Sequence, residues 1–127
     1  MKQNFIKRKV VIGKKRGKLL GFPTANLNLY KKDNLKTGVY AVYVEIKGKN
    51  LPGVAHVGTS KTFREKKSKI EIYIFNYDQD LYNQIIKVIF LKRLRKTKRF
   101  KNKKELTIQI RRDCQMAKRY LKLTNNL

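Results

Sequence analysis

The feature that most constrains the fold of this chain is a series of short segments rich in β-branched and aromatic residues, each bounded by residues that favour turns. Such segments are typical of β-strands. They cover residues 5–12, 38–46, 51–57, 69–75 and 84–91. Turn-favouring residues are expected at 47–50, at Pro52-Gly53 and at 76–80. Five or six short strands at this spacing predict a closed or nearly closed antiparallel barrel, which removes free sheet edges.

The last quarter of the sequence changes its hydrophobic period from that of a strand to that of a helix. Apolar residues recur at Leu106, Ile110, Ala117 and Leu121. This spacing predicts a helix from about Lys103 that packs one stripe on the barrel. Asn102, with Glu105 three residues later, resembles a capping box. The basic stretch 92–104 is expected to be a solvated connection into that helix.

Length and cysteine content favour one domain in a reducing compartment. The 127 residues suit a single compact domain, here expected to span 1–127. The single Cys114 excludes an internal disulfide and a cysteine zinc site. The sequence has no apolar run long enough to span a membrane and no export signal, so a cytoplasmic protein is expected. A monomer is expected, because no coiled-coil seam or long apolar surface helix appears.

The chain is strongly basic, with 33 Lys and Arg against 8 Asp and Glu and a formal net charge of +25. One explanation is a genome-wide bias toward Lys, Asn and Ile, and this is the explanation we favour. The other is a nucleic-acid-binding barrel, in which a basic groove would follow the phosphates and aromatic residues would stack on bases. The aromatic candidates are Tyr30, Tyr40, Tyr43, Tyr73, Phe75 and Tyr77.

The glycine-rich stretch 13–26 carries the strongest chemical signal. Backbone amides next to Gly13 and Gly17 can approach a phosphate chain closely, and Lys18 adds a positive charge. The spacing of a Walker loop is absent. The glycines alone are equally consistent with a surface loop.

Several short motifs follow one another in an order that resembles the riboflavin kinase family. They are LGFPTAN at 20–26, GVYAV at 38–42, GVA at 53–55 with Thr62-Phe63, IEI at 70–72, DLY at 80–82, Arg95 with Phe100, and Leu106, Gln109-Ile110 and Asp113. The resemblance runs from about residue 10 to 121. It implies a mainly β fold, a six-stranded antiparallel Greek-key β-barrel with a C-terminal α-helix. It also implies transfer of the γ-phosphate of ATP to riboflavin, giving FMN and ADP.

The same resemblance implies roles for particular residues. Thr24 and Asn26 would hold Mg²⁺ and orient the ATP phosphates, and Glu71 would accept the proton of the ribityl 5′-hydroxyl. Residues expected to line the triphosphate are Gly13, Gly17 and Lys18, and those expected near the flavin are Arg95, Lys98 and Phe100.

Some of these residues have simpler explanations. Glu71 alternates with Ile70 and Ile72, so it points to the face opposite the isoleucines, where it could be an exposed glutamate paired with a lysine. Phe100 could be a core residue at the helix entry. Asp113 could orient a basic group or form a surface ion pair.

The chain also departs from the family pattern. Lys61 replaces a common proline, Tyr73 replaces a common histidine, and Asn83 replaces a glycine, a change that asparagine tolerates at positive φ. His56 stands where asparagine is common and is expected to be a barrel residue. A flavin-binding homologue without turnover therefore stays open, as does the choice between a free-standing kinase and a part of a bifunctional FAD synthetase.

Overall fold

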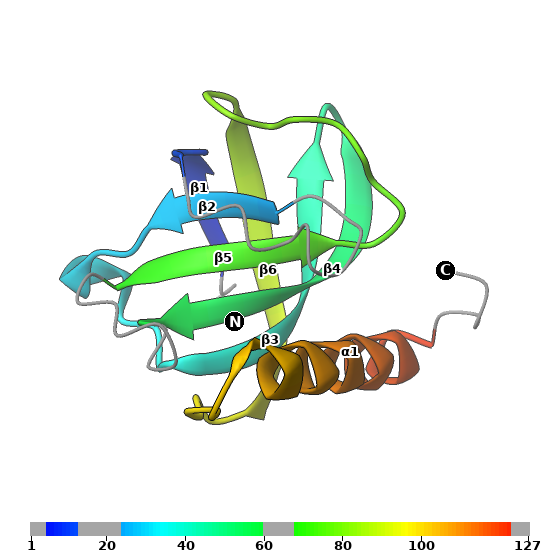
Figure 1. Cartoon of the computed structure of the whole chain (residues 1–127). Coiled ribbons are helices and arrows are strands. Elements are labelled where there is room, and N and C mark those ends of the chain that lie inside the picture. The colour runs from blue at the N-terminus through cyan, green and yellow to red at the C-terminus, as the bar shows by residue number, and fades with distance from the viewer. Residues whose placement is uncertain (1–4, 13–23, 60–67, 123–127) are drawn as a thin grey trace.

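The computed structural model describes residues 5–12, 24–59 and 68–122 (Figure 1). Its strands are β1 (Phe5–Lys9), β2 (Thr24–Asn28), β3 (Gly38–Ile46), β4 (Lys49–Gly58), β5 (Lys69–Ile74) and β6 (Ile85–Arg95). A short 3₁₀ helix, η2 (Lys31–Asp33), follows β2, and the helix α1 (Lys103–Tyr120) follows β6. No helix in these described ranges is long and apolar enough to cross a membrane.

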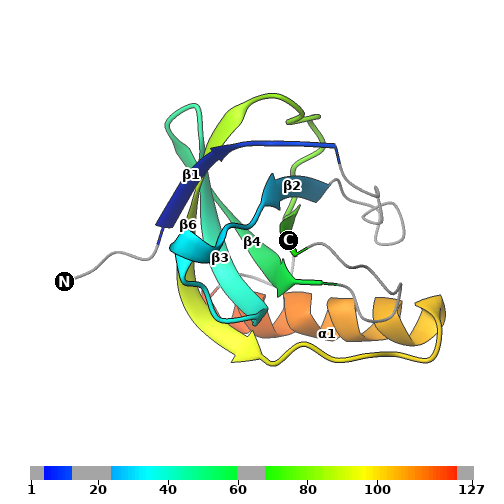
Figure 2. The same ribbon diagram turned by 90° about the vertical axis from the view of Figure 1, so that its left-hand side faces the viewer.

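The six strands form one antiparallel sheet in the order β1-β6-β3-β4-β5-β2. Strand β6 returns to lie beside β3, so β6-β3-β4-β5 is a Greek key. The sheet curls into a half-barrel, which brings its edge strands toward each other (Figure 2). At this seam the Val11 N–H donates to the Asn26 carbonyl at 2.7 Å. The expected Greek-key barrel with a C-terminal helix is confirmed.

The strands differ from those expected in several places. Strand β2 was not expected at all, because its sequence TANLN carries two asparagines. Pro52 and Gly53 lie inside β4 and do not form a turn, since the Pro52 carbonyl accepts the Phe75 N–H and a Cβ on Gly53 would meet the Tyr73 carbonyl. The prediction that 92–104 is a solvated connection is wrong for 92–95, which belong to β6.

Asn83 takes the role that was expected of it. Its φ is 70°, a left-handed conformation that asparagine adopts more readily than most residues. Its N–H donates to the Val10 carbonyl, so the turn before β6 is fixed to the end of the β1 region.

Helix α1 begins as predicted, with one difference in its cap. The Asn102 side chain accepts the Glu105 N–H at 2.9 Å. The Glu105 carboxylate accepts the N–H of Lys101, one residue earlier than a full capping box requires. The helix then lies along one side of the curled sheet (Figures 1 and 2).

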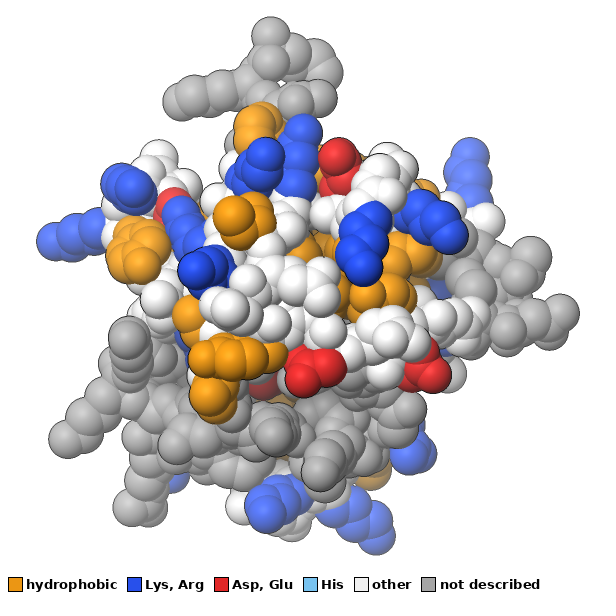
Figure 3. Space-filling model, turned by 90° about the horizontal axis from the view of Figure 1, so that it is seen from above, with side chains coloured by type: hydrophobic (Ala, Val, Ile, Leu, Met, Phe, Trp, Pro, Cys, Tyr) orange, Lys and Arg blue, Asp and Glu red, His pale blue; other side chains and the backbone are white. Residues whose placement is uncertain are grey.

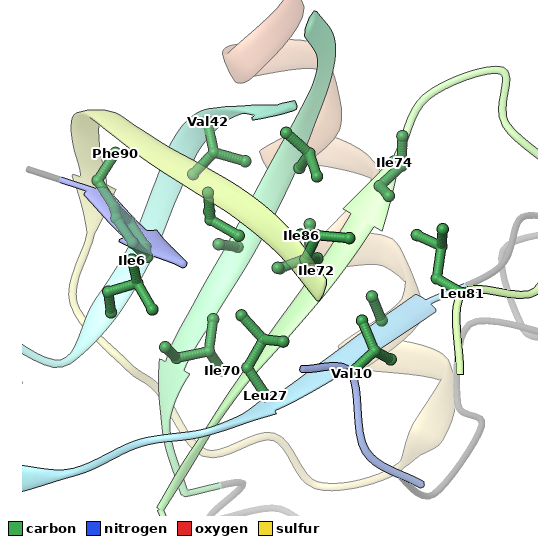
Figure 4. Close-up of a cluster of buried hydrophobic side chains, with 14 of the residues drawn as sticks. Ile6, Val10, Leu27, Val42, Ile70, Ile72, Ile74, Leu81, Ile86 and Phe90 are labelled. Atoms are coloured by element: carbon green, nitrogen blue, oxygen red, sulfur yellow. The ribbon is translucent and has the colours of Figure 1, made fainter. Parts of the chain in front are cut away.

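The sheet has a separate apolar core on each face. The barrel interior is filled mainly by β-branched side chains, among them Ile70, Ile72, Ile74 and Ile86, together with Leu27 (Figure 4). A second core lies between the outer face and α1 and contains Val39, Ala41, Val54, Tyr73, Phe75, Ile110, Cys114 and Ala117. Because side chains alternate along β5, this one strand serves both cores.

Candidate active site

A row of residues in register crosses five strands of the sheet. Asn26 of β2 pairs with Glu71 of β5, Glu71 with His56 of β4, His56 with Val39 of β3, and Val39 with Arg95 of β6. Directly opposed residues in antiparallel strands project from the same face. Val39 belongs to the core under α1, so the row lies on the outer face of the sheet.

Glu71 is buried in this row, with 5% of its surface exposed. Its Oε1 accepts a hydrogen bond of 2.9 Å from the Tyr73 hydroxyl, and its Oε2 is buried without a partner among the described residues. Ile70 and Ile72 point into the barrel interior, which confirms the alternation expected from the sequence. The alternative of an exposed glutamate on the surface is wrong.

Asn26 lies beside Glu71 and has the same unusual feature. It is 4% exposed, and its Oδ1 is buried without a hydrogen-bond partner in the described part of the chain. Buried polar atoms are nearly always hydrogen-bonded. Two orphaned oxygens on paired residues therefore indicate a place where a ligand supplies the missing donors or a cation.

The donor set at this place fits a hard cation better than zinc. Asn26 and Glu71 offer amide and carboxylate oxygens, and Thr24 lies half-buried two residues before Asn26 on the same face. The described ranges contain no group of three or more His, Cys, Asp or Glu that could hold a metal ion. Mg²⁺ suits such a sparse oxygen set, because it keeps several waters and is often shared with substrate phosphates.

Part of the expected phosphate-binding region lies beyond the part of the chain that the structure describes. Gly13, Gly17 and Lys18 lie outside the described residues, as does Lys61. Of the residues expected to bind ATP, the structure places Thr24 and Asn26.

The far end of the row is anchored to the helix by a buried ion pair. Arg95 Nε lies 2.7 Å from Asp113 Oδ1, and Arg95 Nη2 lies 2.7 Å from Oδ2. Asp113 is 1% exposed and also accepts a 3.0 Å hydrogen bond from Gln109. Asp113 therefore orients a basic group, and the alternative of a surface ion pair is wrong.

Arg95, Lys98 and Phe100 lie together at the junction of β6 and α1. The Arg95 Cζ is 5.9 Å and the Lys98 Nζ 5.6 Å from the centroid of the Phe100 ring. Phe100 is half-buried and is not among the described residues of the two cores. The junction presents one aromatic ring with two cations near it.

Tyr73 was not predicted as a partner of Glu71, although a signal was present in the sequence. Residues two apart on a strand share a face, so a tyrosine at 73 lies within reach of a glutamate at 71. Gln109 belongs to the family motifs, but its hydrogen bond to Asp113, one helical turn later, was not predicted.

Other surface features lie away from Glu71. A hollow of about 560 Å³ lies over β1, β3 and β6, with Ile6, Tyr40 and Phe90 among its lining residues. These side chains belong to the barrel interior, the face opposite to that of Glu71. Seen from above, Lys and Arg side chains are spread around the described surface, with apolar side chains visible between them (Figure 3).

A family model described as "Flavokinase: Riboflavin kinase" matches residues 1–121. The chain belongs to the riboflavin kinase family. A bifunctional riboflavin kinase/FMN adenylyltransferase from Bacillus subtilis is 43% identical over 120 residues, which cover 91% of this chain and 38% of that protein. The chain therefore spans about two fifths of the length of this relative.

Two solved structures are similar to this chain, and one of them is a riboflavin kinase. The crystal structure of riboflavin kinase from Trypanosoma brucei matches with a TM-score of 0.61 and 28% identity, covering 93% of this chain and 79% of that one. A crystal structure described as a macrolide-efflux protein from Streptococcus pneumoniae matches with a TM-score of 0.72 and 34% identity, covering 86% of this chain and 36% of that one.

Proposed function

We propose that this chain is a riboflavin kinase domain that transfers the γ-phosphoryl group of ATP to the ribityl 5′-hydroxyl of riboflavin, giving FMN and ADP. The observation that carries the proposal is the pair of buried, unpartnered oxygens on Asn26 and Glu71. A kinase of this type needs one oxygen that receives a proton and others that hold a cation. The paired strands β2 and β5 bring both kinds together.

Glu71 is the proposed general base. Its Oε2 would accept the hydrogen bond of the substrate hydroxyl and then take its proton as the new P–O bond forms. In a loose phosphoryl-transfer transition state the hydroxyl needs orientation more than early deprotonation. A buried, fixed carboxylate therefore suffices for this step.

Thr24 and Asn26 are the proposed ligands of Mg²⁺, through the threonine hydroxyl and the amide Oδ1. The ion would neutralise charge on the ATP phosphates during transfer. Asn26 lies on the strand next to Glu71, so the phosphates would be held beside the base. Gly13, Gly17 and Lys18 remain proposed contacts of the triphosphate.

Arg95, Lys98 and Phe100 are the proposed flavin-binding residues. An aromatic ring with adjacent cations suits the flat isoalloxazine ring or the phosphate of the product. Arg95 is held in place by Asp113, so its guanidinium is already oriented before a ligand binds.

The first experiment incubates the purified protein with riboflavin, ATP and Mg²⁺ and separates riboflavin from FMN by chromatography. FMN should form, and Glu71→Gln should lower kcat by roughly 10²- to 10⁴-fold, the usual contribution of a general base. Glu45→Gln, on β3 outside the row, is the matched control and should behave like the parent.

Three results would contradict parts of this assignment. Turnover by Glu71→Gln at the parent rate would remove Glu71 from the mechanism. Tight FMN binding without ATP consumption would indicate a non-catalytic flavin-binding homologue, and salt-dependent RNA or DNA binding without FMN formation would favour the nucleic-acid-binding module.

We also propose that residues 1–127 form one domain and that this domain is a cytoplasmic monomer. Its mass in solution, measured by light scattering, tests the monomer. Limited proteolysis tests the single domain, since strands that share one sheet should resist cleavage within β3, β4, β5 and β6.

A further inference from the structure

We propose that Tyr73 is a positioning residue that fixes the Glu71 carboxylate so that one of its two oxygens faces the substrate hydroxyl. The inference rests on the proposed function and adds a residue to its site. Tyr73 acts through Glu71 and does not itself contact the reacting atoms.

The hydrogen bond between the two side chains is buried. The Tyr73 hydroxyl lies 2.9 Å from Glu71 Oε1, and the two residues are 3% and 5% exposed. An O–H donor to a carboxylate makes a charge-assisted bond, which is stronger than a neutral one. The bond therefore holds one oxygen and leaves Oε2 for a ligand.

Packing fixes the donor as well as the acceptor. The Tyr73 ring belongs to the core between the sheet and α1, together with Val39, Ala41 and Ile110. Close packing limits the ring to one position, so its hydroxyl is held at one point above β5. A glutamate with three rotatable bonds would otherwise sample several orientations, at a cost to the reaction.

The cross-strand neighbour completes the arrangement. Glu71 Oε2 and Asn26 Oδ1 are the two buried side-chain atoms without a partner among the described residues, and their residues are paired in register. With Oε1 bonded to Tyr73, Oε2 is the carboxylate oxygen that stays available to a ligand. The hydroxyl of Tyr73 thus decides which carboxylate oxygen reacts.

The test is a double-mutant cycle on kcat with Tyr73→Phe, Glu71→Gln and the double variant. Phenylalanine keeps the ring in its core and removes only the hydroxyl. Tyr73→Phe should lower kcat about ten- to hundredfold, the effect of one hydrogen bond to a charged group, and leave KM for riboflavin and ATP within about twofold. In the Glu71→Gln background the same change should lower kcat by less than about twofold, because there is no base left to position.

Two further variants separate positioning from packing. Tyr43→Phe removes a hydroxyl from β3 outside the row and should leave kcat unchanged. Tyr73→His returns a ring N–H donor at the same position and should recover part of the lost kcat. If Tyr73 served only to pack the core, the smaller histidine ring would not recover kcat.

A second cycle, on the free energy of unfolding in urea, does not depend on kinase activity. Tyr73→Phe should destabilise the parent more than it destabilises Glu71→Gln, since an amide oxygen is a weaker acceptor than a carboxylate. Equal destabilisation in both backgrounds would show that the Tyr73 hydroxyl has no specific interaction with the carboxylate, and the inference would fall whatever the chain's activity.

The kinetic outcomes are equally decisive. An unchanged kcat for Tyr73→Phe, or an equal loss in both backgrounds, would overturn the positioning role while leaving the kinase assignment intact. If the parent forms no FMN but the unfolding cycle shows coupling, the proposed function fails, and the inference fails with it although the hydrogen bond exists.

Discussion

Two arginine–aspartate pairs have nearly the same geometry but hold together different parts of the molecule. In the first pair Arg8 donates to the two Asp33 oxygens at 2.8 and 2.7 Å. In the second Arg95 donates to the two Asp113 oxygens at 2.7 and 2.7 Å. Both are bidentate, the strongest form of this interaction.

The Arg8 pair closes the barrel at its seam. Arg8 lies on edge strand β1, and its Nη1 also donates to the carbonyl of Asn28, at the end of edge strand β2, at 2.8 Å. The Tyr30 N–H donates to Asp33 and the Tyr30 ring lies 4.7 Å from the guanidinium. One side chain therefore joins two strands that lie at opposite ends of the sheet order.

The Arg95 pair attaches α1 to the sheet, next to the proposed flavin site. As whole residues Asp113 is buried and Asp33 half-buried, but the exposed fractions of the paired side chains are close, at 16% and 2% for Arg95 and Asp113 and 17% and 6% for Arg8 and Asp33. Removing one partner of a buried pair leaves an uncompensated charge. The comparison teaches that position, more than geometry or burial, sets what each pair contributes.

The largest effect should come from Asp113→Ala. This change leaves Arg95 without its carboxylate and should lower the free energy of unfolding by about 3 kcal/mol. Because Arg95 also loses its orientation, KM for riboflavin should rise while KM for ATP stays near that of the parent. Urea unfolding and steady-state kinetics measure the two effects.

Gln109→Ala is the control for the Asp113 variant, since it removes the weaker neutral contact to the same carboxylate. It should lower the free energy of unfolding by only about 1 kcal/mol. Asp113→Ala could instead leave KM for both substrates unchanged and lower the free energy of unfolding no more than Gln109→Ala does. The pair would then have no role beyond that of an ordinary surface contact.

A smaller effect is expected from Arg8→Met, which keeps the apolar stem and removes the guanidinium. The partly hydrated pair and the bond to Asn28 together should contribute about 1–2 kcal/mol. Amide hydrogen exchange should accelerate in β1 and β2, where the seam opens, and leave β3 and β4 unchanged. Uniform acceleration of amide exchange across the sheet would contradict a local role. The kinase kinetics of Arg8→Met should equal those of the parent.

The strands and helix that bury apolar side chains could be predicted from the sequence, because alternation and helical period follow directly from burial. Strand β2 could not. Its residues Thr24, Asn26 and Asn28 are polar, and their pairing with β5 is a long-range choice that local propensity does not encode. The end of β6 was not predicted for the same reason. Residues 92–95 have the composition of a charged connection, and their strand partner, β3, is distant in the sequence.

The site shows the same limit. The resemblance to the family named Glu71 and Asn26, and alternation gave the face of Glu71. Neither could show that Glu71 is buried with one oxygen bonded to Tyr73, because that depends on the tertiary packing around β5. The ion pair between Arg95 and Asp113 joins residues 18 positions apart through a helix docking that no local pattern specifies.

The smallest predicted effect is a pH dependence of the free energy of unfolding that comes from the Arg8–Asp33 pair. The hydrogen bonds from Arg8 hold the pKa of Asp33 below the ordinary value of 3.8. A carboxyl whose pKa is lower in the folded state stabilises the fold fully above its unfolded-state pKa, and this contribution is lost as pH falls through the lower, folded-state value. Between about pH 5 and pH 2, Asp33→Asn should therefore show a shallower fall of the unfolding free energy than the parent, measured by urea titrations at each pH. Asp78→Asn, which removes an exposed carboxylate, should leave the slope unchanged. An Asp33→Asn slope equal to that of the parent would mean that the seam is closed by the backbone contact of Val11 with Asn26 and not by the ion pair.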